Sequence, residues 1–559
     1  MMTRTKSLLF AAGLCCLAYT GIAQQQFSRY FTPEKKYLVL PVKNGAPKKN
    51  LELWLNGNLV RYFDMELADG EADWLAYLDI SEWKGKPVEL RVDKLDRSSN
   101  AFHQVLQSDN DGGKAYNEEL RGQFHFSPKR GWTNDPNGMC YYKGEYHLFF
   151  QHNPYGRGWG NMTWGHAVSK DMVHWKEVGD AIHPDGFGPM FSGSAVVDSA
   201  NTSGLGSPND PPMVMFFTGA RAWGQGLAWT RDGRSFQKLG HTVVNRINKD
   251  NRDPKVFWYA PEKHWVMVLW VERQNGENTM EFLTSPDLKN WTPASMVSGG
   301  VGEDRYLFEC PDFYELEVEG RPGEKRWILS AANSMYTIGT FDGKTFRPEL
   351  ERLLTQVGRD YYAAQTFNNE PTGRRIEIGW WRTHTDKGNS SFNQSMTVPM
   401  ELKLVETPAG LRVKRVPVVE LESLRGERVM TGTVTLSDNS SNPAAGVYSE
   451  LMEIITELQP GKAKSIKFAI KGLDLTYDVA SQELSADGVK AKVPLEGENL
   501  RLRIFVDRIG IEVFAQDGLF YMPINKNLSA AAPALSVKTE GGKVKFSKLD
   551  VFALRSAWE

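Results

Sequence analysis

The chain has 559 residues, of which 41% are hydrophobic and 11% aromatic, and this length allows two to four domains of roughly 150 residues each. Its 66 basic and 68 acidic side chains leave a net charge of -2, which argues against a nucleic acid or an anionic membrane as partner, since both bind positively charged surfaces. A neutral ligand suits this charge balance better.

The first 23 residues have the layout of a secretory signal. Two basic residues precede the apolar run LLFAAGLCCLA, and the small residues Gly21 and Ala23 precede a cleavage site at Gln24. The run is too short for a stable membrane span. We therefore expect an exported protein, periplasmic or secreted, that is cleaved near Ala23 and does not insert into a membrane. Only Cys140 and Cys310 remain after cleavage, and we expect two buried thiols.

Residues 27–107 form short alternating segments separated by turn residues, the pattern of a small N-terminal β-sandwich-like domain. Candidate strands include YLVLPVK, ADWLAYLDI and PVELRVDKL. Residues 108–122 are polar and contain glycine, which predicts a linker. The pattern of this first part predicts a fold and indicates no function.

Between residues 123 and 405 a short phrase recurs, in which Ser or Thr is followed two positions later by Asp and then by an aromatic residue. The aspartates are Asp171, Asp232, Asp287 and Asp342, which are 61, 55 and 55 residues apart. Short strands precede each phrase, and no helical periodicity lies between them. Such a period indicates propeller blades, each too small to bury its own face. Four phrases and the closing strand RIEIGWW predict five blades.

Residues 415–559 again alternate, most clearly in LRLRIFVDRIGIEVFAQDG, and predict a C-terminal β-sandwich. Asp507 and Glu512 fall within this alternation, and we expect them on the solvent-facing side of their strands. The whole chain is therefore expected to be all-β: a five-bladed β-propeller followed by a C-terminal β-sandwich, with an additional small N-terminal β-domain.

The repeat also places candidate functional residues. Asp135, in the turn-rich stretch GWTNDPNGMC, lies 36 residues before its marker aspartate, and Asp253 and Glu309 lie 34 and 33 residues before theirs. Ser194 and Gln365 hold the same phase in the two other blades. One phase corresponds to one radius and one height in a propeller, so we expect the three carboxylates to converge around the axis.

Few kinds of functional site need several carboxylates close together on a protein with almost no net charge. The ten histidines are scattered without metal-ligand spacing, so we expect no metal and no cofactor. Glycoside cleavage is the better match, because it needs one carboxylate against a cationic sugar and one carboxylic acid to protonate the leaving oxygen. Trp132, Trp159 and Trp164 lie near the same phase, where each either offers a flat face to a sugar ring or packs in the propeller core.

Eight sequence blocks resemble the signature sequences of glycoside hydrolase family 32, the family of invertases, inulinases and levanases. The blocks are QFHFSP, WTNDPNG, WGNMTWGHAVS, FSGS, RDPKVF, FECPDF, YYAAQTF and GRRIEIGWW. The resemblance extends from about residue 121 to 405 and continues into the C-terminal part. It implies a five-bladed propeller followed by a β-sandwich, which is also the fold that the repeat predicts.

The resemblance implies a role for each carboxylate. Asp135 would be the nucleophile that attacks a fructofuranosyl unit, and Glu309 the general acid and then the base of a retaining double displacement. Asp253 would stabilise the transition state at the ring hydroxyls. The phase favours Glu309 over three nearby carboxylates, those of Glu303, Asp304 and Asp312. The residues implied to bind the terminal fructose are Trp132, Asn134, Gln151, Trp159, Phe191, Ser192 and Arg252.

The expected function is therefore that of a secreted retaining β-fructosidase, which hydrolyses terminal fructofuranosyl residues from levan, inulin or sucrose. Exo attack is favoured because the pocket-forming blocks are present and no evident insertion opens a long cleft. Three alternatives remain open: a fructosyltransferase, an endo-acting fructanase using the same site, and a fructan-binding protein without turnover. Linkage preference and oligomeric state do not follow from the sequence.

Overall fold

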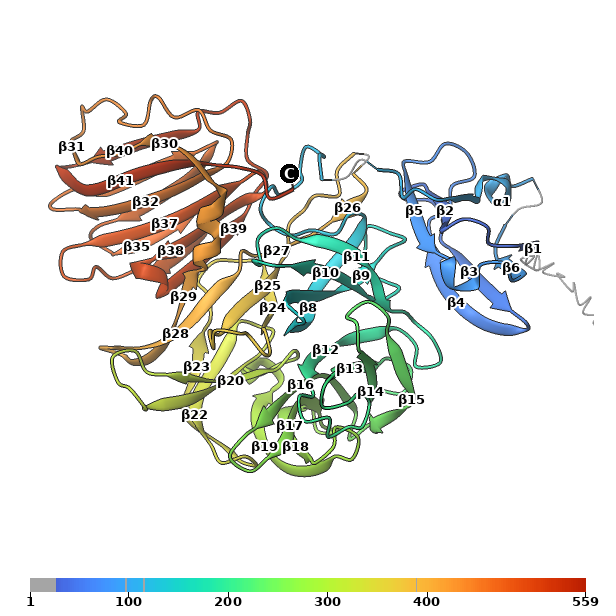
Figure 1. Cartoon of the computed structure of the whole chain (residues 1–559). Coiled ribbons are helices and arrows are strands. Elements are labelled where there is room, and N and C mark those ends of the chain that lie inside the picture. Colours follow the sequence, from blue (N-terminus) through green and yellow to red (C-terminus); the bar gives the residue numbers. More distant parts are fainter. Residues whose placement is uncertain (1–26, 96–97, 114–115, 389, 559) are drawn as a thin grey trace, which may run out of the picture.

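The computed structural model describes residues 27–95, 98–113, 116–388 and 390–558. Figure 1 shows three lobes in chain order: a blue N-terminal lobe, a central ring of sheets from cyan to yellow, and an orange and red C-terminal lobe. Nearly all regular structure in these residues is strand, which confirms the all-β prediction. The predicted signal at residues 1–23 lies outside the described residues.

Two antiparallel sheets form the N-terminal lobe, in the orders β1-β6-β3-β4 and β5-β2-β7. Leu38 and Leu40 from one sheet and Leu51 and Leu53 from the other are fully buried in one shared core, as the alternating sequence requires of two packed sheets. The bounds are β1 Phe27–Phe31, β2 Tyr37–Val42, β3 Lys49–Leu55, β4 Asn58–Met65, β5 Trp74–Asp79, β6 Val88–Val92 and β7 Leu106–Ser108, with helical turns at Ser81–Trp83 and Ala101–Gln104.

The central part forms five antiparallel sheets, and the predicted five-bladed propeller is confirmed. The first strand of each sheet lies nearest the axis: β12 contacts both β8 and β16, and β24 contacts both β8 and β20. The first three blades consist of β8 Gly131–Tyr142, β9 Glu145–Asn153, β10 Thr163–Ser169 and β11 Lys176–Ile182; β12 Met190–Val197, β13 Met213–Gly219, β14 Gly224–Thr230 and β15 Gln237–Val244; and β16 Asp250–Tyr259, β17 His264–Glu272, β18 Glu277–Ser285 and β19 Thr292–Val301.

The fourth and fifth blades follow the same plan. Their strands are β20 Asp312–Glu317, β21 Lys325–Ser330, β22 Met335–Phe341 and β23 Phe346–Leu354, then β24 Tyr361–Thr366, β25 Ile376–Trp381, β27 Ser395–Met396, β28 Met400–Thr407 and β29 Gly410–Pro417. The fifth sheet thus continues past residue 405. The ring closes where β26, Phe392–Asn393, pairs in parallel with β8 of the first blade.

The recurring Ser/Thr-x-Asp phrase is the turn between the third and fourth strands of a blade. Oδ1 of Asp171 accepts hydrogen bonds from the backbone N–H groups two and three residues later, at 3.0 and 2.9 Å. Asp232, Asp287 and Asp342 accept the same pair of bonds in the next three blades. The phrase recurs with the blade period because a short aspartate can close each of these turns without any distant partner.

The C-terminal lobe is a β-sandwich of two sheets, which share one apolar core. One sheet contains β30 Arg425–Met430, β31 Val434–Leu436, β32 Met452–Gln459, β37 Leu500–Asp507, β38 Gly510–Ala515, β39 Phe520–Asn525 and β41 Val544–Leu554. The other contains β33 Ser465–Ile470, β34 Leu473–Asp478, β35 Glu483–Ala486, β36 Val489–Lys492 and β40 Leu535–Glu540. Helical turns lie at Val419–Leu424 and Gln516–Gly518 in this part of the chain, and at Gly302–Asp304 between the third and fourth blades of the propeller. No helix in the described ranges has the length and apolar character needed to cross a membrane.

The solvent-facing positions expected for Asp507 and Glu512 were wrong, because both side chains are fully buried. His125, at the start of the propeller, places Nδ1 2.7 Å from Asp507 Oδ2 and Nε2 3.3 Å from Glu512 Oε1. The alternation correctly separates two faces of the sheet, but the polar face is covered by the propeller instead of by water. These carboxylates hold two domains together.

Candidate active site

The three phased carboxylates come from the inner strands of the first and third blades and from the segment that enters the fourth. Asp135 lies in β8, Asp253 in β16, and Glu309 just before β20. Cys310 links them: its backbone N–H donates to Asp253 Oδ2 at 2.9 Å, and its Sγ lies 3.5 Å from Asp135 Oδ2 and 3.4 Å from Asp253 Oδ2. The structure therefore brings together side chains that are far apart in the sequence.

Irregular backbone surrounds these carboxylates. The pairing of β8 with β9 shifts register between Thr133 and Pro136, next to Asp135, and an equivalent bulge interrupts β16 beside Asp253. Asp253 and Glu309 have left-handed φ angles of 65° and 55°, which are uncommon for residues other than glycine. Bulges and left-handed residues turn side chains out of the regular alternation, so they aim these groups at a common space.

Asp135 is held by donors on both oxygens. Ser192 Oγ donates to Oδ2 at 2.7 Å and Asn134 Nδ2 to Oδ1 at 3.1 Å, while Trp132 Nε1 donates to Asn134 Oδ1 at 3.0 Å. Burial raises the pKa of Asp135 above its ordinary value and the nearby charge of Glu309 adds to this, although the bonds from Ser192 and Asn134 oppose it. These bonds fix the direction of the carboxylate.

Asp253 has a strongly raised pKa. Burial raises the pKa of Asp253 to about 7 against the attraction of Arg252, and the charges of Glu309 and Asp135 add to the increase. The backbone N–H of Asp253 donates to Thr218 Oγ1 at 3.0 Å, which fixes the strand at this bulge. The charges of Glu309 and Asp135 therefore favour the protonated form of Asp253.

Glu309 has one cationic and one neutral donor. Arg252 forms an ion pair with Oε1, and the hydroxyl of Tyr362 donates to Oε2 at 2.7 Å. The guanidinium of Arg252 also lies over the ring of Trp270, 4.2 Å from its centroid. Arg252 is thus oriented by an aromatic face and reaches both Glu309 and Asp253, whose Oδ2 is 4.0 Å from its Nε.

Aromatic rings stand around the carboxylates. Trp132 meets Trp380 edge to face with centroids 6.0 Å apart, and Phe191 contacts both Trp159 and Trp223 at 5.9 and 5.6 Å. Trp159 is 58% exposed, so much of its surface is open to solvent.

Two of the residues predicted from the sequence make structural contacts between the first and second blades. Trp164 is fully buried and donates its Nε1–H to the carbonyl of Phe191 at 3.1 Å, so the core interpretation holds for this tryptophan. Gln151 is also buried, and its Nε2 donates to the carbonyl of Met190 at 3.0 Å. In these contacts both side chains fasten the first blade to the start of β12.

The rival carboxylates lie elsewhere. Glu303 and Asp304 are exposed on a helical turn, where Asp304 pairs with Arg352 at 3.0 Å. Asp312 is fully buried and pairs with Lys255 at 2.6 Å inside the propeller.

Sequence spacing missed Tyr362 and misassigned two positions of the phase. Ser194 does not face the carboxylates but donates to the carbonyl of Pro254 at 2.7 Å, and Gln365 is buried in the fifth blade. Bulges between Phe191 and Gly193 and between Tyr362 and Gln365 explain why the spacing selected the wrong residues. In each blade the residue that reaches the site, Ser192 or Tyr362, lies two or three positions earlier in the chain. Ser192 lies in the block FSGS and Tyr362 in the block YYAAQTF, so the resemblance of these blocks to family 32 signatures was the available signal.

Cys140 and Cys310 are both free and buried, which confirms the prediction of two thiols. The sulfur of Cys310 is part of the site itself, through its contacts with Asp135 and Asp253.

Two sequence profiles match consecutive parts of the chain. Residues 125–414 match the family described as glycosyl hydrolases family 32 N-terminal domain, and residues 420–552 match its C-terminal domain. The chain belongs to glycoside hydrolase family 32. It is therefore a glycoside hydrolase, and the N-terminal lobe precedes both family 32 matches.

Family 32 relatives cover most of the chain. A levanase of Bacillus subtilis is 38% identical over 489 residues, spanning 79% of this chain and 72% of the levanase. An extracellular exo-inulinase of Aspergillus awamori is 28% identical over 526 residues, spanning 79% and 96% of the two chains. The crystal structure of exo-inulinase from Aspergillus awamori matches with a TM-score of 0.71 at 26% identity, covering 80% of this chain and 100% of that one.

Proposed function

We propose that this enzyme is a retaining exo-β-fructosidase, which releases terminal fructofuranosyl units from fructans of the levan or inulin type. The observation that carries the proposal is the contact of Cys310 with both Asp135 and Asp253, directly beside Glu309. It supports a site in which several carboxyl groups act on one bond. The names of the relatives, levanase and exo-inulinase, support the substrate class.

In the proposed mechanism Asp135 attacks the anomeric carbon while Glu309 gives its proton to the leaving oxygen. The bond to the leaving group breaks as the bond to Asp135 forms, and a covalent fructosyl-enzyme results. Glu309 then removes a proton from water, which attacks the same carbon and releases Asp135. The bonds that Asp135 accepts from Ser192 and Asn134 support its role as nucleophile, because they leave its direction fixed before the sugar arrives.

Asp253 and Arg252 are proposed to grip the ring hydroxyls of the terminal fructose. Both are mostly buried, and Arg252 is shared between Asp253 and Glu309. The ring hydroxyls of the bound fructose would replace some of these contacts. Sugar binding would then also determine where the carboxyl of Glu309, the general acid, lies. The faces of Trp132 and Trp159 would cover the apolar side of the ring.

The test is fructose release from levan, inulin and sucrose, followed over time by chromatography. Asp135→Asn and Glu309→Gln should each reduce the rate by several orders of magnitude, since both groups act on one bond. Release at the parent rate by either variant would overturn the assignment. A ladder of oligosaccharides would indicate endo attack, new oligosaccharides at high sucrose would indicate transfer, and binding without any product would indicate a binding protein.

We also propose that the protein is exported with cleavage near Ala23. The basic residues and apolar run at the N-terminus support this, as does the name of the extracellular relative from Aspergillus awamori. Sequencing of the mature N-terminus after cell fractionation tests it. A periplasmic or secreted form that begins at Gln24 is expected, and a cytoplasmic form that keeps residues 1–23 would contradict the proposal.

A further inference from the structure

The N-terminal lobe contacts the connection between β9 and β10, residues 154–162, which we call the Trp159 loop. Tyr155 of this loop is almost fully buried, and its ring stacks on Phe63 of β4 with centroids 3.8 Å apart and an interplanar angle of 20°. Tyr155 also belongs to the apolar core of the lobe, although it comes from the propeller. The lobe and the loop therefore share one core.

Asn161 joins the loop to the edge of the lobe through hydrogen bonds. Its Oδ1 accepts from the backbone N–H of Asp64 at 3.0 Å, and its Nδ2 donates to the carbonyl of the same residue at 2.8 Å. The side-chain amide thus pairs with edge strand β4 much as another strand would. The same Nδ2 lies 3.0 Å from Oδ1 of Asn153, which closes the base of the loop.

The opposite side of the loop is fixed to the connection between β25 and β27. Arg157 Nη1 donates to the carbonyls of Gly388 and Ser390 at 3.1 Å each, and Asn393 Nδ2 donates to the carbonyl of Arg157 at 3.1 Å. Trp159 follows this anchor by two residues. The loop is therefore held from two directions, by the lobe and by the connection between β25 and β27.

Trp159 connects this loop to the chemistry. Its ring meets Phe191 edge to face at 5.9 Å, and Phe191 directly precedes Ser192, whose hydroxyl donates to Asp135. The neighbouring Gly158 and Gly160 have no side chains that could support the ring, and the carbonyl of Gly158 accepts a hydrogen bond from Asn153 Nδ2 at 2.8 Å at the base of the loop. The other anchors of the loop are at Tyr155, Arg157 and Asn161.

We infer that the N-terminal lobe is a clamp that positions the Trp159 loop and so shapes the sugar-binding wall of the active site. Phe63 and Asp64 are its positioning residues, acting through Tyr155 and Asn161. This gives the lobe a role that neither family 32 match covers. The effect on sugar binding rests on the proposed function, whereas the clamp itself does not.

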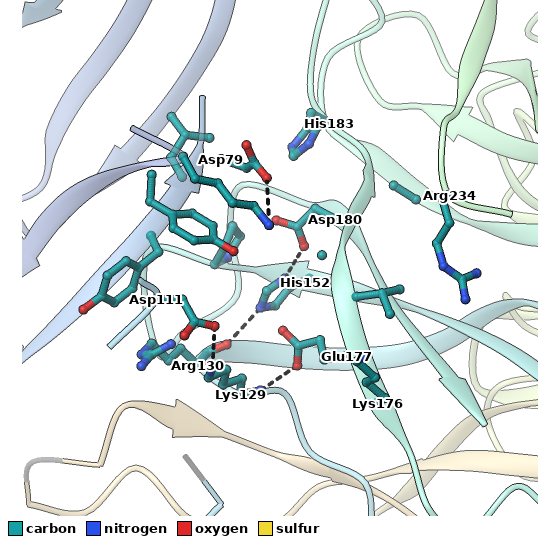
Figure 2. A pocket seen from close by; sticks show the side chains of 18 of the residues that line it. Asp79, Asp111, Lys129, Arg130, His152, Lys176, Glu177, Asp180, His183 and Arg234 are labelled. Atoms are coloured by element: carbon teal, nitrogen blue, oxygen red, sulfur yellow. Dashed lines mark hydrogen bonds and ion pairs between the residues drawn. The ribbon is translucent and has the colours of Figure 1, made fainter. Parts of the chain in front are cut away.

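Other contacts also cross from the lobe to the propeller: the guanidinium of Arg130 lies 4.7 Å from the ring centroid of Tyr77, and the Tyr62 hydroxyl donates to the carbonyl of Asp185 at 3.5 Å. A cleft of about 1220 Å³ separates the lobe from the outer strands of the first blade, and Figure 2 shows its charged lining. Several of its ion pairs stay within one part of the molecule: His152 pairs with Asp180 at 2.8 Å within the first blade, and Lys36 with Asp79 at 3.9 Å within the lobe. Such pairs contribute little to holding two domains in one orientation.

The experiment uses the full-length enzyme and hydrogen exchange of the peptide that covers residues 154–162, read by mass spectrometry. Phe63→Ala and Asn161→Ala should each speed exchange in this peptide about tenfold or more, because the lost stack or amide pair lets the loop open. For fructan hydrolysis we expect KM to rise about three- to tenfold with a smaller change in kcat, since a misplaced Trp159 weakens binding before chemistry.

Asn201→Ala is the matched control. Asn201 has a similar left-handed φ, 52° against 49° for Asn161, and pairs its amide with Gly206 in the same two-way manner at 3.1 and 2.9 Å. That pairing lies between β12 and β13, away from the N-terminal lobe. The control should leave both the exchange of residues 154–162 and KM unchanged.

Asn161→Gly separates backbone conformation from the amide pairing, because glycine accepts the left-handed φ without strain. It should behave like Asn161→Ala. Unchanged exchange and KM in both Phe63→Ala and Asn161→Gly would overturn the clamp, as would an equal effect of Asn201→Ala. Faster exchange with an unchanged KM would keep the mechanical contact but overturn its role in shaping the site. Without any fructan hydrolysis the proposed function fails, and the exchange result still decides the clamp.

Discussion

The hydroxyl of Tyr362 donates to Oε2 of Glu309 at 2.7 Å, and this bond joins the fifth blade of the propeller to the carboxyl group just before the fourth. The tyrosine is itself fixed, because the guanidinium of Arg382 lies 4.3 Å from its ring centroid and 4.7 Å from that of Trp380. Burial raises the pKa of Tyr362 far above its ordinary value, and the charge of Glu309 adds to this, so the tyrosine remains a neutral donor.

Tyr362→Phe should therefore lower kcat about tenfold or more, since a hydrogen bond to a charged group contributes roughly 1.5–3 kcal/mol. Steady-state kinetics on fructan measures the effect. Tyr361→Phe is the matched control, because Tyr361 also donates to a carboxylate, Glu377 Oε1 at 2.7 Å, in the buried interior. It should lower stability and spare kcat. An equal loss of kcat in both variants would contradict a specific role for Tyr362.

Asp253→Asn should gain stability relative to the parent enzyme as pH rises. The pKa of Asp253 is raised to about 7, chiefly by burial, so the folded state favours the protonated carboxyl. The stability that this group contributes is fully present below about pH 4 and is lost as pH rises through 7. Asparagine stays neutral, so the difference should grow by roughly 2–3 kcal/mol between pH 5 and 8. Denaturant unfolding at the two pH values measures it, and a pH-independent difference would contradict the buried-carboxyl account.

His125→Gln, at the propeller–sandwich interface, should change with pH in the same direction but over a higher pH range. Burial alone would lower the pKa of His125, but its bonds to Asp507 and Glu512 raise it to about 9. The charged imidazole therefore contributes stability that is fully present below pH 6.5 and is lost as pH rises through 9. The deficit of the variant should shrink by roughly 3 kcal/mol between pH 6 and 10.

Unfolding curves across this range give the measurement for His125. His174→Gln is the control, because it removes an exposed pair with Asp171 at 2.7 Å and should change stability little. A deficit of His125→Gln that stays constant from pH 6 to 10 would show that the interface does not depend on the imidazolium.

Both cysteines should resist alkylation in the native enzyme. Burial raises the pKa of Cys140 to about 12, and burial together with the neighbouring Asp135 and Asp253 raises that of Cys310 well above its ordinary value. The thiolate is the reactive form, so iodoacetamide at pH 8 should modify neither residue until the protein is unfolded. Mass spectrometry of native and denatured samples tests this. If iodoacetamide labels Cys310 in the native enzyme and activity is lost, the thiol is accessible and the prediction is wrong.

Much of the architecture follows from the sequence because a blade is a local object. Its strands are neighbours along the chain, and an aspartate such as Asp171 closes each outer turn with its own following backbone. Local bonds leave a regular trace in the spacing, which is why the number of blades and the common phase of Asp135, Asp253 and Glu309 could be predicted.

The tertiary structure decided everything that depends on contacts between distant segments. Bulges, which leave no trace in spacing, brought Tyr362 to Glu309 and turned Ser194 away from the site. Docking of the propeller buried Asp507, which alternation alone assigned to water. The N-terminal lobe likewise meets Asn161 through a surface whose sequence shows no partner. A side chain's pattern reports which face of a strand it occupies, whereas only packing determines what covers that face.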